Sequence, residues 1–396
     1  MTTTESTTAD GTASASAGPT RMRPANELNA VPHLPGDGLA RRTPSDEISA
    51  ALHLVNSPRY VGRSPGPPDS LPALLVAHAE AAVAVSGADR TAWNGHIIEA
   101  GEGILGVAHW DGTLHLDREC ILDPLRELYA DPGSRQPDDA LIRCREALVT
   151  VLHEQSHFLG PADATQDAAR VAFRLPGARA LEEGVAEAWA HDHLNEYVTR
   201  LGIDEVAPGI NEVRSTPSYQ AFVPAVRVLT ADLDRRAGLP RGSTLDALNR
   251  QTAEGQWPLI IDSAYRSSRL PDLVPPDREQ SVRLHLETTL RTSFADLAQL
   301  ESLPRDLAAT KSRAAGHHTV HRLTQEIATT EAIFDHPKPQ PTPTLDPPTT
   351  LPLRKALSGL TPPLRTPPPS TPADRPTTAA LTRKPQHLSA GPVHHR

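Results

Sequence analysis

The chain has 396 residues, enough for two or three domains, and its net charge of −9 makes nucleic acid an unlikely main partner. No stretch approaches the roughly 18 apolar residues of a membrane-spanning helix, and the first residues lack the basic and apolar regions of a signal peptide. Two cysteines, Cys120 and Cys144, are too few for a disulfide framework. We therefore expect a cytoplasmic protein without a membrane anchor, with export by a non-classical route left open.

Aromatic residues occur only between Tyr60 and Phe334, so only this interval can build a large core. Residues 1–45 are rich in Ser, Thr, Ala and Gly and are predicted to be disordered. Residues 336–396 hold many of the 40 Pro and more Lys and Arg than Asp, which predicts an extended basic tail. Such a tail can dock a partner domain or stay solvated. Residues 46–335 are predicted to form one domain.

Two elements are expected early in this domain. Residues 70–85 carry apolar side chains at helical spacing and predict a helix. Residues 103–117 read as two short strands around Asp111-Gly112, which is typical of a hairpin with a type I′ turn. His109 and His115 lie on this hairpin, and we interpret them as residues of its polar face and not as metal ligands.

An apolar helix is predicted between Asp138-Asp139, which supply an N-cap, and Gly160-Pro161, which end it. It carries His153, Glu154 and His157 in a His-Glu-x-x-His pattern. Residues four apart lie on one face of a helix, so the two imidazoles can bind a single ion. Glu154 flanks that ion and is the natural base for a water bound to it.

A second motif follows in residues 180–189, where Glu183 begins the pattern Glu-Gly-Val-Ala. Together the two motifs resemble the gluzincins, the thermolysin-like and zinc-aminopeptidase families, over about residues 140–200. The resemblance implies zinc bound by His153, His157 and Glu183. It also implies an α+β, zincin-like fold with a small twisted sheet beside the active-site helix. The edge strand of such a sheet binds extended substrate.

Glu187 lies four residues after Glu183 and so faces the same way on the predicted helix. The resemblance makes Glu183 the ligand and leaves Glu187 to accept the free ring N–H of a ligating His. We expect Gly184 to let the two site helices approach closely. The reverse assignment of the two carboxylates stays open, with His191 as the next candidate ligand.

The part of the domain after residue 201 is predicted to be a helical lobe. Four of its segments carry apolar residues at helical spacing between Pro and Gly breaks: residues 219–238, 243–255, 276–303 and 304–334. Residues 46–201 then hold the sheet and the site helices.

Two features of the lobe bear on function. Tyr219 stands where related families often place a Tyr or His that stabilises the oxyanion, although a core tyrosine that caps the helix start is an equally good interpretation. The His317, His318 and His321 cluster has no neighbouring Glu in a polar run, so we interpret it as a solvated face.

These observations predict a zinc metallopeptidase that hydrolyses peptide bonds of a peptide or protein substrate, with Glu154 as general base. One alternative is a non-catalytic adaptor that keeps the scaffold and acts through its Pro-rich tail. Another is a toxin-like effector protease that acts outside its own cell.

Overall fold

The structure, a computed structural model, describes three stretches of the chain: residues 44–57, 66–101 and 103–335. The described residues as far as Glu331 belong to one compact unit, and residues 332–335 belong to a second unit. The segment 1–45, apart from its last two residues, and the tail 336–396 lie outside the described residues.

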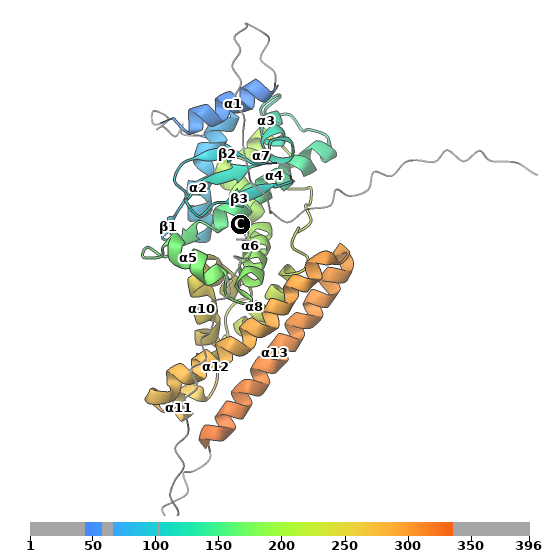
Figure 1. Ribbon diagram of the computed structural model, residues 1–396. Coiled ribbons are helices and arrows are strands. Elements are labelled where there is room, and N and C mark those ends of the chain that lie inside the picture. Colours follow the sequence, from blue (N-terminus) through green and yellow to red (C-terminus); the bar gives the residue numbers. More distant parts are fainter. Residues whose placement is uncertain (1–43, 58–65, 102, 336–396) are drawn as a thin grey trace, which may run out of the picture. The chain divides into compact units, whose positions relative to one another are not determined.

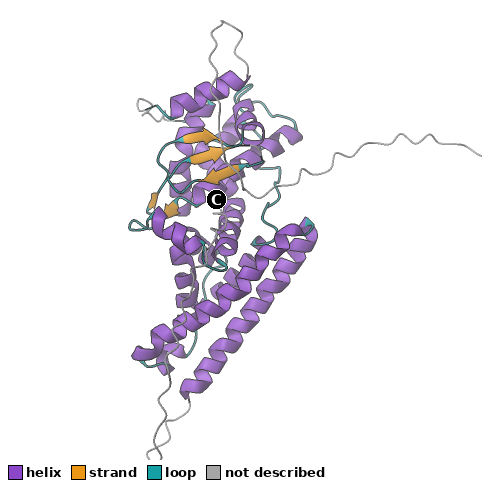
Figure 2. Ribbon diagram, in the orientation of Figure 1, coloured by secondary structure: helices purple, strands orange, loops and turns teal. Residues whose placement is uncertain are grey.

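The described chain is mostly helical and has two small sheets, which confirms the expected α+β class (Figures 1 and 2). Its first elements are α1 (Pro44–Val55), α2 (Leu71–Ser86), β1 (Arg90–Thr91), β2 (Ile97–Glu99), β3 (Gly106–Ala108), β4 (Leu114–Leu116), a π-helix (Arg118–Leu122), α3 (Asp123–Glu127), α4 (Asp138–Ser156), β5 (Leu159–Gly160), α5 (Gln166–Phe173) and α6 (Ala178–Leu201). The later ones are α7 (Ile203–Val206), α8 (Val223–Ala237), α9 (Ser243–Asn249), α10 (Ala253–Arg266), α11 (Leu270–Leu273), α12 (Pro276–Ala295), a 3-10 helix (Asp296–Ser302) and α13 (Arg305–Asp335). None of the described helices is both long and apolar enough to cross a bilayer.

Helix α6 is the central element of the packing, because α2, α4, α8, α9, α10 and α12 all contact it. Every residue from Ala180 to Ala190 is buried, which is typical of a helix surrounded by other elements and not of one that covers a surface. This stretch nevertheless contains three glutamates. Buried carboxylates need charged or hydrogen-bonding partners, so the centre of α6 is a candidate functional site.

The larger sheet has the strand order β2-β4-β3, with β2 parallel and β3 antiparallel to β4. Strand β3 is an edge strand and contacts helix α4, so the sheet lies beside the predicted active-site helix, as expected. The opposite edge is covered by the Asn56 amide. Its Nδ2 donates to the Ile97 carbonyl oxygen at 2.7 Å, and its Oδ1 accepts the Ile97 N–H at 2.9 Å.

The predicted hairpin is present, but its turn differs from the expected two-residue type I′ turn. The His109 N–H still bonds the Thr113 carbonyl, so the loop has three residues, and Gly112 adopts φ +89°. The Gly112 N–H donates to the His109 carbonyl, so a four-residue turn closes on a left-handed glycine. The Asp111-Gly112 pair is typical of the two-residue and of the three-residue loop, because both contain a glycine with positive φ.

The helical lobe contains the four predicted helices with altered boundaries. Helix α8 begins four residues after the predicted start, and α13 agrees with prediction closely. The segment 243–255 is two helices, and the second, α10, continues to Arg266 through Pro258 because buried Trp257, Ile260 and Ile261 hold it against the core. The last turns of the predicted helix 276–303 are 3-10.

The expectation for Gly184 is wrong. A Cβ at this position would lie 2.6 Å from Val226 Cγ2 and 3.2 Å from Phe222 Cβ, so the glycine lets α6 approach α8. It does not lie between the two helices that carry the predicted ligands. The error arose because one sequence position specifies a close contact without saying which element makes it.

His78 of α2 is fully buried, and α2 packs against α4. The Nδ1 atom of His78 lies 2.6 Å from the Leu75 carbonyl oxygen, and its ring meets Trp93 edge-on with centroids 4.6 Å apart. Burial lowers the pKa of His78 to about 4, because the charged form loses its hydration. The side chain is therefore neutral in the folded protein near pH 7.

This lowered pKa predicts a pH dependence of stability. Between pH 6.5 and 4 the unfolded chain binds a proton at His78 that the folded chain does not, so the free energy of unfolding falls as pH falls through this window. The loss is about 3 kcal/mol. Urea unfolding of the metal-free protein measures this loss in the free energy of unfolding between pH 6.5 and 4. In His78→Leu the loss should be smaller by this amount. Equal pH slopes in both proteins would show that His78 is solvated.

Candidate metal centre

Helix α4 carries both predicted imidazole ligands at its C-terminal end. It begins at Asp138 behind the N-cap Pro137, so Asp138 lies in the first turn, where its charge complements the helix dipole, and not at the cap as predicted. The helix ends at Ser156, and His157 is its C-cap with helical dihedral angles. His153 and His157 therefore project from one face, and their Nε2 atoms are 3.2 Å apart.

Helix α6 brings Glu183 to the same point. Its Oε2 lies 3.4 Å from His153 Nε2 and 3.5 Å from His157 Nε2. The three atoms thus form a nearly equilateral triangle. Ligands about 2.05 Å from a tetrahedral zinc ion stand about 3.3 Å from one another, so the separations match three corners of such a site. Among the described residues, these three side chains are the group whose ligand atoms can share one ion.

The two helices run in opposite directions and meet in a register that repeats every four residues. Arg145 Nη2 of α4 donates to Asn195 Oδ1 of α6 at 2.6 Å. Two turns further along α4, His153 meets Glu187, and one more turn on, His157 meets Glu183. Each step of four residues forward along α4 is matched by an equal step back along α6. The spacing of the His pair is therefore repeated in the spacing of the Glu pair.

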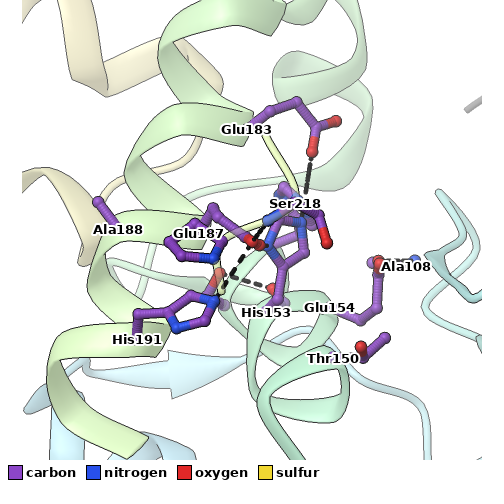
Figure 3. A network of polar contacts seen from close by, with 12 residues as sticks. Ala108, Thr150, His153, Glu154, Glu183, Glu187, Ala188, His191 and Ser218 are labelled. Atoms are coloured by element: carbon purple, nitrogen blue, oxygen red, sulfur yellow. Dashed lines mark hydrogen bonds and ion pairs between the residues drawn. The ribbon is translucent and has the colours of Figure 1, made fainter. Parts of the chain in front are cut away.

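A carboxylate lies beside the Nδ1 atom of each His. Glu187 Oε2 is 2.7 Å from His153 Nδ1 (Figure 3), and Glu182 Oε1 is 3.0 Å from His157 Nδ1. An ionised carboxylate can only accept, so His157 Nδ1 donates its hydrogen to Glu182, while His153 and Glu187 form a close ion pair, and each Nε2 is directed to the shared point. Contacts of this kind fix the tautomer and raise the basicity of a metal ligand. Glu187 thus lies beside His153 Nδ1.

The electrostatics of the cluster favour a cation. Each of the residues His153, Glu154, His157, Glu182, Glu183 and Glu187 is at most 9 % exposed. Burial lowers the pKa of His153, but the Glu183 and Glu187 carboxylates outweigh it and raise that pKa well above its ordinary value. Burial raises the pKa of Glu183, but attraction from His157 and His153 holds it well below its usual range. The carboxylates are ionised and favour positive charge at the imidazoles. The donor set therefore fits a divalent ion.

Glu154 points away from the triangle towards the edge strand. Its Oε2 accepts the Ala108 N–H at 2.8 Å, a group on the side of β3 that does not pair with β4 (Figure 3). Gly106 makes this approach possible, because a Cβ there would lie 2.7 Å from Glu154 Cγ and 3.1 Å from Thr150 Cγ2. Strand β3 therefore fixes the position of the Glu154 carboxylate next to α4.

The Gly106 contact makes a test of this arrangement. In Gly106→Ala the new methyl group must displace Glu154, so we expect the peptide hydrolysis predicted from the sequence to fall about 100-fold, while the predicted zinc affinity is unchanged. Val107→Ala is the control, because its side chain lies on the other face of the strand. Activity and zinc titrations on both variants give the answer. A loss of zinc in Gly106→Ala would mean that the strand supports the ligands instead.

Tyr219 lies against the first ligand. Its ring stacks on His153 with centroids 5.3 Å apart and planes 6° apart. Burial of the phenol and the Glu183 and Glu154 carboxylates raise the pKa of Tyr219 well above its usual value, so the hydroxyl keeps its proton. Its backbone carbonyl also accepts the Phe222 and Val223 N–H groups at the start of α8. Both interpretations of this tyrosine therefore have a structural basis.

The remaining candidates lie apart from the triangle. His109 and His115 are neighbours on the hairpin with ring centroids 5.6 Å apart, and His109 pairs with Asp111. The His317, His318 and His321 side chains are exposed on α13, which confirms a solvated face. Cys144 is buried and free, and Cys120 is free and exposed. His191 contacts Glu187 Oε1 at 3.4 Å and is not part of the triangle.

Two contributors were missed in the sequence. Glu182 was not assigned, although two adjacent glutamates in an apolar run already indicate two buried partners, and the motif provides two imidazoles. The second is Ser218, whose backbone N–H donates to Glu187 Oε1. It could not be predicted, because almost every residue type has the same backbone N–H.

A small polar cavity lies behind the His157–Glu182 pair. It is lined by Ser156, Asn249, Gln251 and Gln256 as well as the pair itself. The His157 Nδ1 atom faces Glu182 on this side, whereas Nε2 faces Glu183. The cavity is thus on the opposite side of the imidazole from the triangle, and its polar walls suit ordered water.

Comparison with protein-family models, with curated proteins and with solved structures finds no match for this chain.

Proposed function

We propose that the chain is a zinc-dependent metallopeptidase of gluzincin type with a zincin-like fold. The observation that carries the proposal is the triangle of His153, His157 and Glu183 atoms at tetrahedral spacing beside a buried Glu154. Two imidazoles and one carboxylate are a donor set that suits zinc and leaves one position open. When bound there, zinc supplies a Lewis acid that brings the pKa of a water towards neutrality and polarises a carbonyl.

The side chains then have separate tasks. His153, His157 and Glu183 hold the ion, while Glu187 and Glu182 orient the two imidazoles. Glu154 accepts a proton from the attacking water and delivers it to the nitrogen of the leaving amine. Tyr219 keeps its proton and donates a hydrogen bond to the carbonyl oxygen as negative charge develops there.

The substrate of this proposal is a peptide or a protein segment in extended form. Strand β3 is an edge strand, and Ala108 on its unpaired side touches Glu154, so a chain added along this edge lies next to the base. A non-catalytic adaptor has no need for a buried carboxylate placed in this way, which favours the enzyme over that alternative. The Pro-rich tail 336–396 remains a proposed docking segment for a partner domain.

Metal analysis of the purified full-length chain, joined to digestion of a broad peptide library, tests the function. We expect one zinc ion per chain and cleavage that stops when a chelator removes the metal and returns when zinc is restored. Zinc without cleavage would favour the adaptor. A chain that binds no zinc would overturn the proposed centre itself.

A further inference from the structure

The Glu187 carboxylate joins two parts of the chain that have separate tasks in the proposed centre. Its Oε2 lies 2.7 Å from Nδ1 of the ligand His153. Its Oε1 accepts the backbone N–H of Ser218 in the segment between α7 and α8 (Figure 3). One side chain therefore contacts both a ligand on α4 and a loop that is not part of either site helix.

The contact to Ser218 lies one residue before Tyr219. Residues 211–220 contain no helix or strand. Besides Glu187, the end of this segment is held at Pro217, whose carbonyl oxygen accepts from Arg305 Nη2 at 2.8 Å, and at Tyr219, whose carbonyl oxygen accepts the Phe222 and Val223 N–H groups at the start of α8. Tyr219 follows Ser218 directly and stacks on the same His153 that Glu187 contacts. The contacts thus form a closed ring: His153 to Glu187, Glu187 to Ser218, and Tyr219 back to His153.

We propose that Glu187 couples metal binding to the docking of residues 211–220, and so positions Tyr219 as well as His153. An ion held at Nε2 fixes the His153 ring, and a fixed ring holds both the Glu187 carboxylate and the surface on which Tyr219 stacks. The coupling is reciprocal by thermodynamic linkage, so docking of the segment strengthens metal binding by the same factor by which the metal strengthens docking. This inference rests on the metal centre and does not depend on peptide hydrolysis.

Hydrogen exchange of the full-length chain tests the first half of the coupling. Adding zinc should slow exchange of the Ser218 amide by at least about fivefold relative to the chelated protein, which is the lower range of measured couplings between sites. Exchange in the largely exposed N-terminal half of α12 serves as the internal reference and should not change. If the Ser218 amide exchanges equally fast with and without zinc, the coupling does not exist.

Two matched variants test the reciprocal half. Ser218→Pro removes the backbone donor to Glu187, whereas Ser218→Ala keeps it and removes only the hydroxyl. Zinc affinity should fall in Ser218→Pro by the factor found in the exchange experiment and stay unchanged in Ser218→Ala. Equal affinity in Ser218→Pro and the unaltered chain would show that Glu187 serves His153 alone. If Ser218→Pro does not fold, the exchange experiment still decides.

The outcome is distinct from that of the proposed function. A chain that binds zinc, protects Ser218 and cleaves no peptide would retain the coupling and lose the peptidase. A chain that cleaves peptides but shows no zinc-dependent protection would retain the peptidase and lose the coupling.

Discussion

Replacing Glu154 with Gln is expected to lower the rate of peptide hydrolysis by about 10³-fold or more while zinc stays bound. The amide has the size of the carboxylate, and its oxygen can still accept the Ala108 N–H that the structure places at 2.8 Å. The edge strand therefore keeps its position. What disappears is the basic oxygen that takes a proton from water.

Glu146→Gln is the control for this variant, because Glu146 is exposed on the same helix two turns earlier. It should retain full activity and full zinc affinity. The measurements are the initial rate on the best library peptide and a zinc titration against a competing chelator. Full activity in Glu154→Gln would remove the general base from the proposal, whereas loss of zinc in that variant would make Glu154 a ligand.

The second large effect concerns the glutamates of α6. Glu183→Ala should lose zinc almost wholly, because Glu183 Oε2 is the atom that completes the triangle with the two Nε2 atoms. Glu187→Ala should bind zinc about 10 to 100 times more weakly and keep some activity, since it removes a partner of a ligand and not a ligand. Glu182→Ala should resemble Glu187→Ala, because it has the same relation to His157.

Glu196→Ala is the control, since Glu196 is exposed on the same helix. Zinc titrations of the four variants give an order of affinities. The expected order places Glu183→Ala far below the other three. If Glu187→Ala lost zinc and Glu183→Ala did not, the two carboxylates would have to exchange roles.

The site residues could be predicted from the sequence where their arrangement depends on the geometry of a single helix. The four-residue spacing of His153 and His157, and that of Glu183 and Glu187, each follows from the pitch of one helix. Their meeting depends on the register of α4 against α6, which no local pattern contains. The resemblance to known zinc sites supplied that register for Glu183, and the same register then brings Glu182 to His157.

Other features depend on contacts between distant segments and so could not be predicted. The Ala108 N–H that holds Glu154 comes from a strand 46 residues earlier in the chain. Gly184 indicated a close approach, but only the packed structure shows that the neighbour is α8. The sequence predicted that the helix ends at Gly160-Pro161, which is too late, because α4 ends at Ser156. Leu159–Gly160 pairs with β1 in a two-stranded sheet instead of extending the helix.

The Asn56 contact on strand β2 has a consequence for self-association. An exposed sheet edge offers unpaired backbone groups to a strand of another molecule and is a common starting point for aggregation. On β2, the Asn56 amide occupies both the N–H and the carbonyl of Ile97, so a single side chain takes the place of a neighbouring strand. The β3 edge is protected less fully, by the bond from Ala108 to Glu154. Copies of this chain that join through the larger sheet would therefore do so along β3, and such pairing would compete directly with an extended peptide for the same edge.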